Sequence, residues 1–217
     1  SQSILDDGLV IRSQGVAEYL GGGLLARFDF DNQGRGKNYL EASLRGGKLK
    51  MDFQSADFIN GPDVVTYESG GQYFGGHLAI GRIFNFNESK TLDFYGKYLV
   101  TALSGDQVLV AGSTPVSFNN NISQRLRGGV RFGYNLASSL RLVTGLGYEY
   151  EFDGKTVAQT QGWPLKTLKH SGGTALAELG LSLRLAGNVP MTFTLGGQGF
   201  LGQRDGVNAS LQLGFEF

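Results

Sequence analysis

Every second residue near the end of the chain is apolar, and the residues between them are small, polar or charged. The apolar set is Val207, Ala209, Leu211, Leu213, Phe215 and Phe217. A period of two residues is typical of a β-strand with one face toward an apolar medium and the other toward water. Because the same alternation recurs along the chain, the sequence predicts an all-β fold.

Nine segments carry this alternation, and each has about the ten residues that a tilted strand needs to cross a bilayer. No apolar run approaches the length of about 18 residues that a transmembrane helix requires. Alternating strands instead cross a membrane as an antiparallel β-barrel, which is the predicted fold class. The nine segments lie at about residues 19–30, 39–53, 73–86, 91–102, 123–134, 139–153, 174–185, 191–202 and 206–217.

Three features of the composition bear on the fold and its partners. The charges of the 19 basic and 19 acidic residues cancel. The net charge therefore indicates neither nucleic acid nor an anionic membrane surface as a partner. The 35 glycines suit backbones that approach closely, bends and tight turns in a barrel. The absence of cysteine means only that the fold needs no disulfide chemistry.

The strand face opposite the apolar stripe carries most of the charge. We expect it either to form cross-strand ion pairs that stiffen a wet interior, each worth little, or to form a polar pore that an unfolded chain can cross without sticking. A soluble barrel with an apolar interior is disfavoured, because a small core cannot bury so many charges. The candidate lumen-lining residues are Arg27, Glu41, Arg45, Asp93, Lys97, Arg125, Arg127, Arg131, Arg141, Glu149, Glu151, Glu178 and Arg184.

The connections between segments alternate between short and long. Outer-membrane barrels have short periplasmic turns and longer external loops, so residues 54–72, 103–122 and 154–173 are expected outside the cell and the C-terminus in the periplasm. In the second segment the phase slips at Gly46 and Gly47, which predicts a bulge or an exit from the membrane there.

The strand count is odd, whereas single-chain bacterial barrels have an even number. We therefore expect residues 1–18, an extracellular N-terminal segment or loop, either to hide another strand or to follow strands that lie before Ser1. The barrel domain at 19–217 would then be incomplete at its N-terminal side. It would show an open edge, or a partner strand beside 206–217.

From about residue 19 to its end the chain resembles the C-terminal translocator barrel of classical monomeric autotransporters, the type Va secretion proteins of Gram-negative bacteria. Seven short matches follow one another in family order, and an aromatic residue ends the chain. Phe200 stands where the family more often has tyrosine. The matches lie at residues 22–27, 39–45, 92–98, 123–131, 148–154, 177–181 and 199–206.

The resemblance implies a translocator in the bacterial outer membrane that anchors and exports an N-terminal passenger domain. The family barrel has twelve strands, so this chain would correspond to strands four to twelve. The implied partners are outer-membrane lipids, the barrel-assembly machinery and the passenger polypeptide in the lumen. Leu213, Phe215 and Phe217 would form the assembly signal. The alternative is a small autonomous outer-membrane barrel that is structural, adhesive or enzymatic.

Catalysis is not expected. His77 falls on the inner face and His170 in a long loop, and no local motif supplies the serine or aspartate partner that a catalytic histidine needs. The stretch Asp153 to Thr156 is similar to a phosphate-binding loop, but Glu149 stands where that motif begins with glycine. No catalytic residue, cofactor or metal site is therefore predicted.

Overall fold

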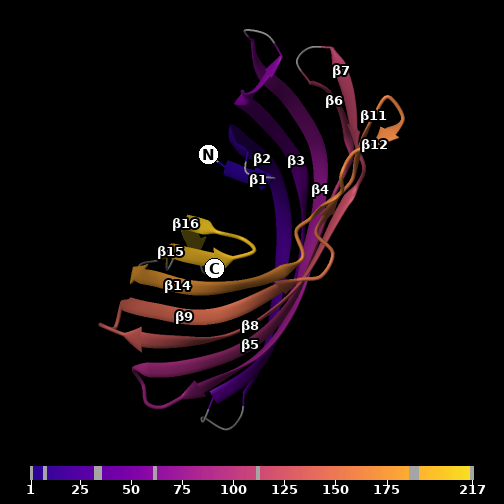
Figure 1. The fold of residues 1–217 in the computed structure, drawn as a ribbon. Helices are drawn as coiled ribbons and strands as arrows, with labels where there is room; N and C mark the ends of the chain where they lie inside the picture. Colours follow the sequence, from indigo (N-terminus) through magenta and orange to yellow (C-terminus); the bar gives the residue numbers. More distant parts are fainter. Residues whose placement is uncertain are drawn as a thin grey trace.

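The structure is a computed structural model that describes residues 2–6, 9–31, 36–60, 63–110, 113–185 and 191–215. Its main element is an antiparallel sheet of ten strands in the order β1-β2-β3-β4-β5-β8-β9-β14-β15-β16. The sheet bends into an open curl (Figure 1). The strands are β1 (Gln2–Asp6), β2 (Leu9–Asp31), β3 (Gly36–Asn60), β4 (Asp63–Asn85), β5 (Lys90–Leu103), β8 (Asn121–Asn135), β9 (Leu140–Glu151), β14 (Gly172–Leu185), β15 (Met191–Gly202) and β16 (Gly206–Phe215).

All nine predicted strands are present, and β15 has the predicted bounds. Strands β2, β3 and β4 are much longer than predicted, with 23, 25 and 23 residues. Residues 9–18, expected as a segment or loop outside the barrel, are the first part of β2, and Gln14 pairs with Gln54 of β3. Ladder hydrogen bonds between these extensions satisfy the backbone, which explains strand structure where the two-residue pattern is weak.

The phase slip at Gly46 and Gly47 is not a bulge. The β2–β3 ladder runs without interruption through both glycines, and the register shift in β3 lies later, between Ser55 and Ile59. The alternation is unbroken, so beyond the glycines the apolar residues share a face with Glu41. Phe53 stacks on Tyr67, its partner on β4, with ring centroids 4.9 Å apart. Beyond the two glycines, the inner face of β3 therefore carries apolar side chains such as Phe53 in place of charged ones.

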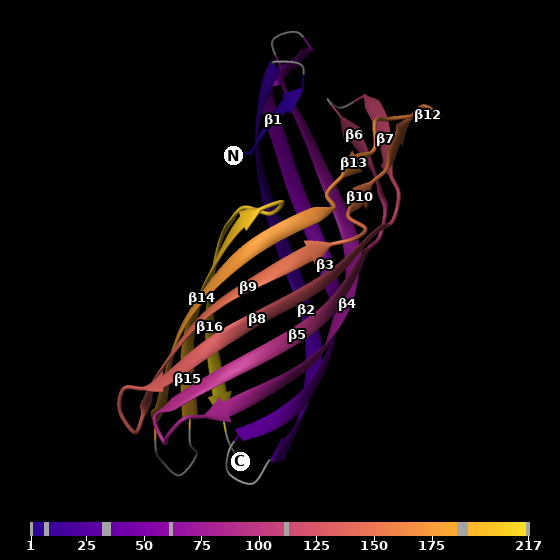
Figure 2. The ribbon, with the colours of Figure 1, turned by 60° about the horizontal axis from the view of Figure 1, so that its bottom comes forward.

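Two small sheets occupy connections that were predicted as loops. A four-stranded sheet has the order β12-β11-β7-β6, and β10 pairs with β13. Both lie at one end of the curl, opposite the short turns of β4–β5 and β8–β9 (Figure 2). The strands are β6 (Asp106–Val110), β7 (Thr114–Phe118), β10 (Lys155–Thr156), β11 (Ala158–Thr160), β12 (Trp163–Pro164) and β13 (Leu168–Lys169).

The four-stranded sheet has its own small core. Val108, Val116 and Ala158 are buried together, and Tyr67 and Phe118 pack against them. Asp106 fastens this sheet to β4, because its Oδ2 accepts hydrogen bonds from the backbone N–H of Gly70 at 2.7 Å and from Ser69 Oγ at 3.0 Å. Burial raises the pKa of the Asp106 carboxyl, but these hydrogen bonds outweigh it and the pKa is lowered from its ordinary value.

The sheet has open edges. Among the described residues β16 pairs with β15 alone, and no ladder joins it to β1 or β2. The short β1 pairs with residues 9–13 of β2 and does not close the curl (Figure 1). Of the two outcomes expected beside the last strand, an open edge or a partner strand, the described residues show the open edge. No helix in the described part of the chain is long and apolar enough to cross a membrane.

Candidate functional site: the charged inner face

Alternate residues of the sheet point to its inner face, where side chains reach one another across intervening strands. Lys97 of β5 contacts Glu41 of β3 over β4, and Arg141 of β9 donates to Thr91 Oγ1 of β5 at 2.6 Å over β8. Such contacts are favoured on the concave side of a curled sheet, where side chains of successive strands converge. The candidate site is therefore this inner face and the charged clusters on it.

The first cluster is centred on Glu41. Its Oε1 lies 3.0 Å from Lys97 Nζ and 2.9 Å from His77 Nε2, and its Oε2 lies 3.8 Å from an Arg27 guanidinium nitrogen. Asp29 pairs with Arg27 at 2.9 Å. Four successive strands, β2 to β5, thus meet around one carboxylate, which lies between two cationic side chains and an imidazole.

The second cluster is centred on Arg131 and Glu178. Arg131 Nε lies 2.5 Å from Glu178 Oε2, and the same guanidinium lies 3.8 Å from Asp93. Glu178 also accepts hydrogen bonds from Gln198 at 3.2 Å and from the Tyr95 hydroxyl at 3.4 Å. The cluster spans β5 to β15, and most of its polar groups are partnered, as expected on a half-buried surface.

The third cluster surrounds Glu149, whose side chain is only 4% exposed. Arg127, Arg125 and Arg204 approach its carboxylate at 2.7, 3.3 and 3.2 Å. Arg125 also lies 3.7 Å from Glu151, which accepts a hydrogen bond from Ser123 as well. Arg204 comes from the connection between β15 and β16, so this cluster links that connection to β8 and β9.

Two tyrosines lie across glycines on the same face. Tyr39 is the ladder partner of Gly81, and Tyr95 is the ladder partner of Gly129. A Cβ atom added at either glycine would overlap the tyrosine side chain. Guanidinium groups sit over both rings, with Arg27 3.8 Å from the Tyr39 centroid and Arg131 4.0 Å from the Tyr95 centroid. Glycine here makes room for a flat-lying aromatic side chain, which accounts for part of the high glycine content.

The structure brings most of the sequence-predicted lumen residues into these three clusters. Arg45, Arg141 and Arg184 are the exceptions. Arg45 is exposed beside Gly75, and Arg141 binds Asn135 Oδ1 at 2.9 Å near the short turns. Arg184 is exposed in β14, one residue before that strand ends.

The predicted site omits several contributors, among them Tyr39, Ser43, which lies 2.6 Å from His77 Nδ1, Tyr95 and Arg204. The first three share strand parity with Glu41 and Lys97, which would have revealed them. Arg204 lies in a turn, where no periodicity applies.

Two of the three predicted assembly residues, Leu213 and Phe215, lie on β16, which none of the three clusters reaches. Leu213 pairs with Phe193 and is half-exposed, and the backbone of Phe215 pairs with Met191. Phe217 lies outside the described residues.

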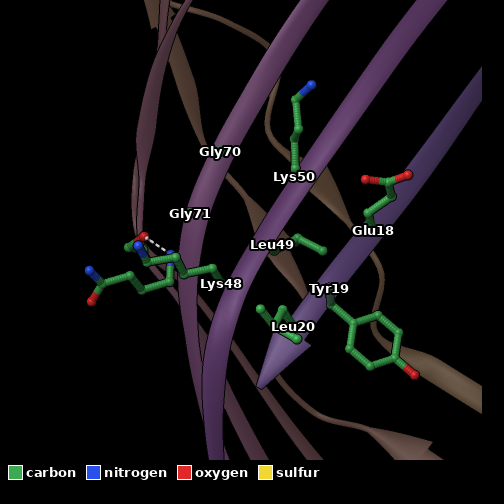
Figure 3. Close-up of a pocket in the computed structure, with 10 residues that line it drawn as sticks. Glu18, Tyr19, Leu20, Lys48, Leu49, Lys50, Gly70 and Gly71 are labelled. Atoms are coloured by element: carbon green, nitrogen blue, oxygen red, sulfur yellow. Dashed lines mark hydrogen bonds between the residues drawn. The ribbon is translucent and has the colours of Figure 1, made fainter. Parts of the chain in front are cut away.

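A separate hollow lies where the extended parts of β2, β3 and β4 meet Ser104 (Figure 3). Ser104 Oγ accepts a hydrogen bond of 2.8 Å from the backbone N–H of Gln72. The charged ends of Glu18, Lys48 and Lys50 point in different directions, so they do not converge on a ligand (Figure 3). Among the described residues no group of three or more histidines and carboxylates could hold a metal ion.

The profile of the family described as "Autotransporter beta-domain" matches residues 12–196. Among solved structures, the chain is similar to the translocator domain of autotransporter NalP from Neisseria meningitidis. The TM-score is 0.51 at 16% sequence identity, and the match covers 95% of this chain and 75% of that chain. No curated protein matches the chain.

Proposed function

The chain belongs to the autotransporter beta-domain family and acts as an outer-membrane translocator for a passenger domain, and we propose that its charged inner face lines the lumen through which the passenger polypeptide passes. The observation that carries this proposal is the contrast between the two faces. Inner positions hold clustered ion pairs, whereas the outer residues Leu126, Leu146 and Leu195 are 51, 66 and 57% exposed. Lipid suits such an outer face, and water suits the inner one.

A lumen with these charges favours passage over binding. Each of the three clusters pairs carboxylates with nearby cations, which compensates part of the charge that a passing chain meets. Charge pairing therefore supports both roles that the sequence left open, stiffening of the wall and a non-adhesive pore.

Closure of the lumen requires that the edges of β2 and β16 be paired. An unpaired backbone group in the hydrocarbon layer costs several kcal/mol. We propose that both edges carry a neighbouring strand in the membrane. Disulfide trapping between cysteines at edge positions of β2 and β16 would report direct pairing, and its failure would assign both edges to other strands.

We propose an orientation in which the four-stranded sheet lies outside the cell and the short turns lie in the periplasm. The lengths of the connections support this orientation, because external loops are longer than periplasmic turns in this class of barrel. Cysteines at Gln161 and Ser104 should then react with an impermeant maleimide on intact cells, and one at Ser138 should not. Labelling of Ser138 alone would invert the orientation.

We also propose that the barrel-assembly machinery recognises the end of the last strand through Leu213, Phe215 and Phe217. Support comes from the alternation of β16 and from its open edge. Deletion of Phe217 should slow assembly more than Phe132→Ala does. Its hydrophobic contribution of at most about 3 kcal/mol would not explain complete loss of assembly. Normal assembly without Phe217 would exclude a recognition role.

Export itself is tested on the full-length protein. An epitope inserted N-terminal to the barrel should be cleaved by protease added to intact cells while the barrel resists. Retention of the epitope in the periplasm, with a correctly assembled barrel, would contradict the translocator function. The same assay with Leu126→Val, a mild change on the outer face, serves as the control for assembly.

A further inference from the structure

Ser43, His77 and Glu41 form a chain of hydrogen bonds on the inner face. Ser43 Oγ lies 2.6 Å from His77 Nδ1, and His77 Nε2 lies 2.9 Å from Glu41 Oε1. Glu41 and Ser43 are alternate residues of β3, and His77 faces Ser43 directly across the β3–β4 ladder. A hydroxyl, an imidazole and a carboxylate are thus held in line by two neighbouring strands.

The partners of Glu41 determine which imidazole nitrogen carries the proton. Lys97 and Arg27 flank the carboxylate at 3.0 and 3.8 Å, so Glu41 accepts hydrogen bonds and donates none. His77 Nε2 must then donate to Glu41, which leaves the lone pair of Nδ1 free to accept the Ser43 hydroxyl proton. This is the arrangement that activates a serine nucleophile, with the base oriented by a third group.

Access and charge around the serine fit the same chemistry. The side chains of His77 and Glu41 are each 15% exposed, whereas Ser43 is half-buried on the inner face. Arg45, two residues along the same face, is an exposed cation, the kind of group that stabilises a developing oxyanion. Next to it, beside Gly75, lies Thr101 Oγ1, a buried hydroxyl with no hydrogen-bond partner in the part of the chain that the structure describes.

We propose that Ser43 is an acyl-accepting nucleophile and that Ser43, His77 and Glu41 hydrolyse carboxylic-acyl compounds that enter the lumen. Ser43 Oγ attacks the carbonyl carbon while His77 Nδ1 takes the hydroxyl proton, and the carbonyl electron pair moves to oxygen beside Arg45. Collapse expels the leaving group, which receives the proton from Nδ1. Water, deprotonated by Nδ1, then cleaves the acyl-serine ester and returns the proton to Ser43.

Two sources supply the same carbonyl chemistry: a small diffusible ester, or a backbone amide of a polypeptide inside the lumen. Turnover of p-nitrophenyl acetate by the purified full-length protein, lost in Ser43→Ala, would identify the first. A fragment of the full-length protein that forms with time and is absent from Ser43→Ala would identify the second. Absence of both, in protein that is folded, would overturn the proposal.

The most direct probe is a fluorophosphonate, which reacts with activated serines and needs no variant to place the adduct. On full-length protein in outer membranes we expect mass spectrometry to find the adduct on Ser43. Ser182 provides the matched control, because it also faces inward but bonds Thr194 Oγ1 at 3.0 Å instead of an imidazole. Ser182→Ala should leave the labelling rate unchanged. An adduct on Ser182, or none on Ser43, would overturn the proposal.

Substitutions at His77 and Glu41 test whether these residues activate Ser43 or only pack against it. His77→Asn should slow labelling by about 10²- to 10⁴-fold, the usual contribution of a general base. It should also abolish the rise of the rate with pH. Glu41→Gln should slow labelling to a similar degree, because the carboxamide can donate to Nε2 and place the imidazole proton on Nδ1. Heat-modifiable migration of each variant reports folding. Equal labelling of folded wild type and folded His77→Asn would show that His77 does not activate the serine.

Discussion

Tyr39 and Gly81 face each other across the β3–β4 ladder, and the tyrosine ring lies in the space that a side chain at Gly81 would fill. From there the Tyr39 hydroxyl donates a hydrogen bond of 3.2 Å to Asp93 Oδ2 on β5. Because Gly81 has no side chain, Tyr39 of β3 can extend across β4 and bond Asp93 of β5. The same relationship between Tyr95 and Gly129 connects β5 to Glu178 on β14.

Replacement of Gly81 by alanine should therefore be destabilising. The added methyl group displaces the Tyr39 ring from Arg27 and Asp93, and overpacking of this kind costs about 1–3 kcal/mol. The free energy of unfolding in urea, measured in detergent micelles, would show the loss. Gly96→Ala is the matched control, because nothing lies within 4 Å of a Cβ at Gly96. Equal stability of both variants would contradict the packing argument.

The ion pair of Arg131 and Glu178 should contribute more to stability than an exposed pair. Glu178→Gln keeps the shape but leaves Arg131 with a weaker partner, at a cost of about 1–3 kcal/mol. Glu68→Gln removes one of the two carboxylate partners of Lys50, 3.6 Å away on an exposed surface, and should change stability by less than about 0.5 kcal/mol. The same urea titration measures both variants, and a larger loss for Glu68→Gln would refute the ranking.

Lipid-facing and inward positions should differ sharply in their tolerance of charge. Leu181 points outward, and Leu181→Arg should impair membrane assembly at a cost of about 2–4 kcal/mol if the site lies near the midplane. The next residue, Ser182, points inward, where an arginine meets water and other polar groups. Ser182→Arg should assemble almost normally. Comparable damage from the two substitutions, measured as the folded fraction in outer membranes, would reverse the assignment of the faces.

The hydrogen bonds by which Asp106 holds β6 against β4 should weaken in acid. The pKa of the Asp106 carboxyl is lowered in the folded state, so its contribution is complete above the unfolded-state pKa of about 3.9 and is lost as the pH falls through the folded-state value. At neutral pH, Asp106→Asn should speed hydrogen exchange at the Gly70 amide, and in strong acid the difference from wild type should vanish. Asp153→Asn, in another connection, should leave Gly70 exchange unchanged at both pH values.

The alternation of residues predicted the strands well because each spanning strand has one apolar and one polar face. It failed at β6, β7 and β11, which were expected as loops. These strands are short, and the core that they form with Tyr67 depends on contacts between distant segments. Periodicity located the charged face but not the hydrogen-bonded chain of Ser43, His77 and Glu41. That chain depends on the β3–β4 register, which the sequence does not specify locally.

The central claim is that the charged inner face is the path of the passenger polypeptide. Site-specific photocrosslinking during export of the full-length protein tests it most directly, with the photoreactive residue at Lys97 on the inner face or at its neighbour Tyr98 on the outer face. We expect crosslinks to the passenger from position 97 and none from position 98. Passenger crosslinks from position 98, or from neither position while export proceeds, would contradict it.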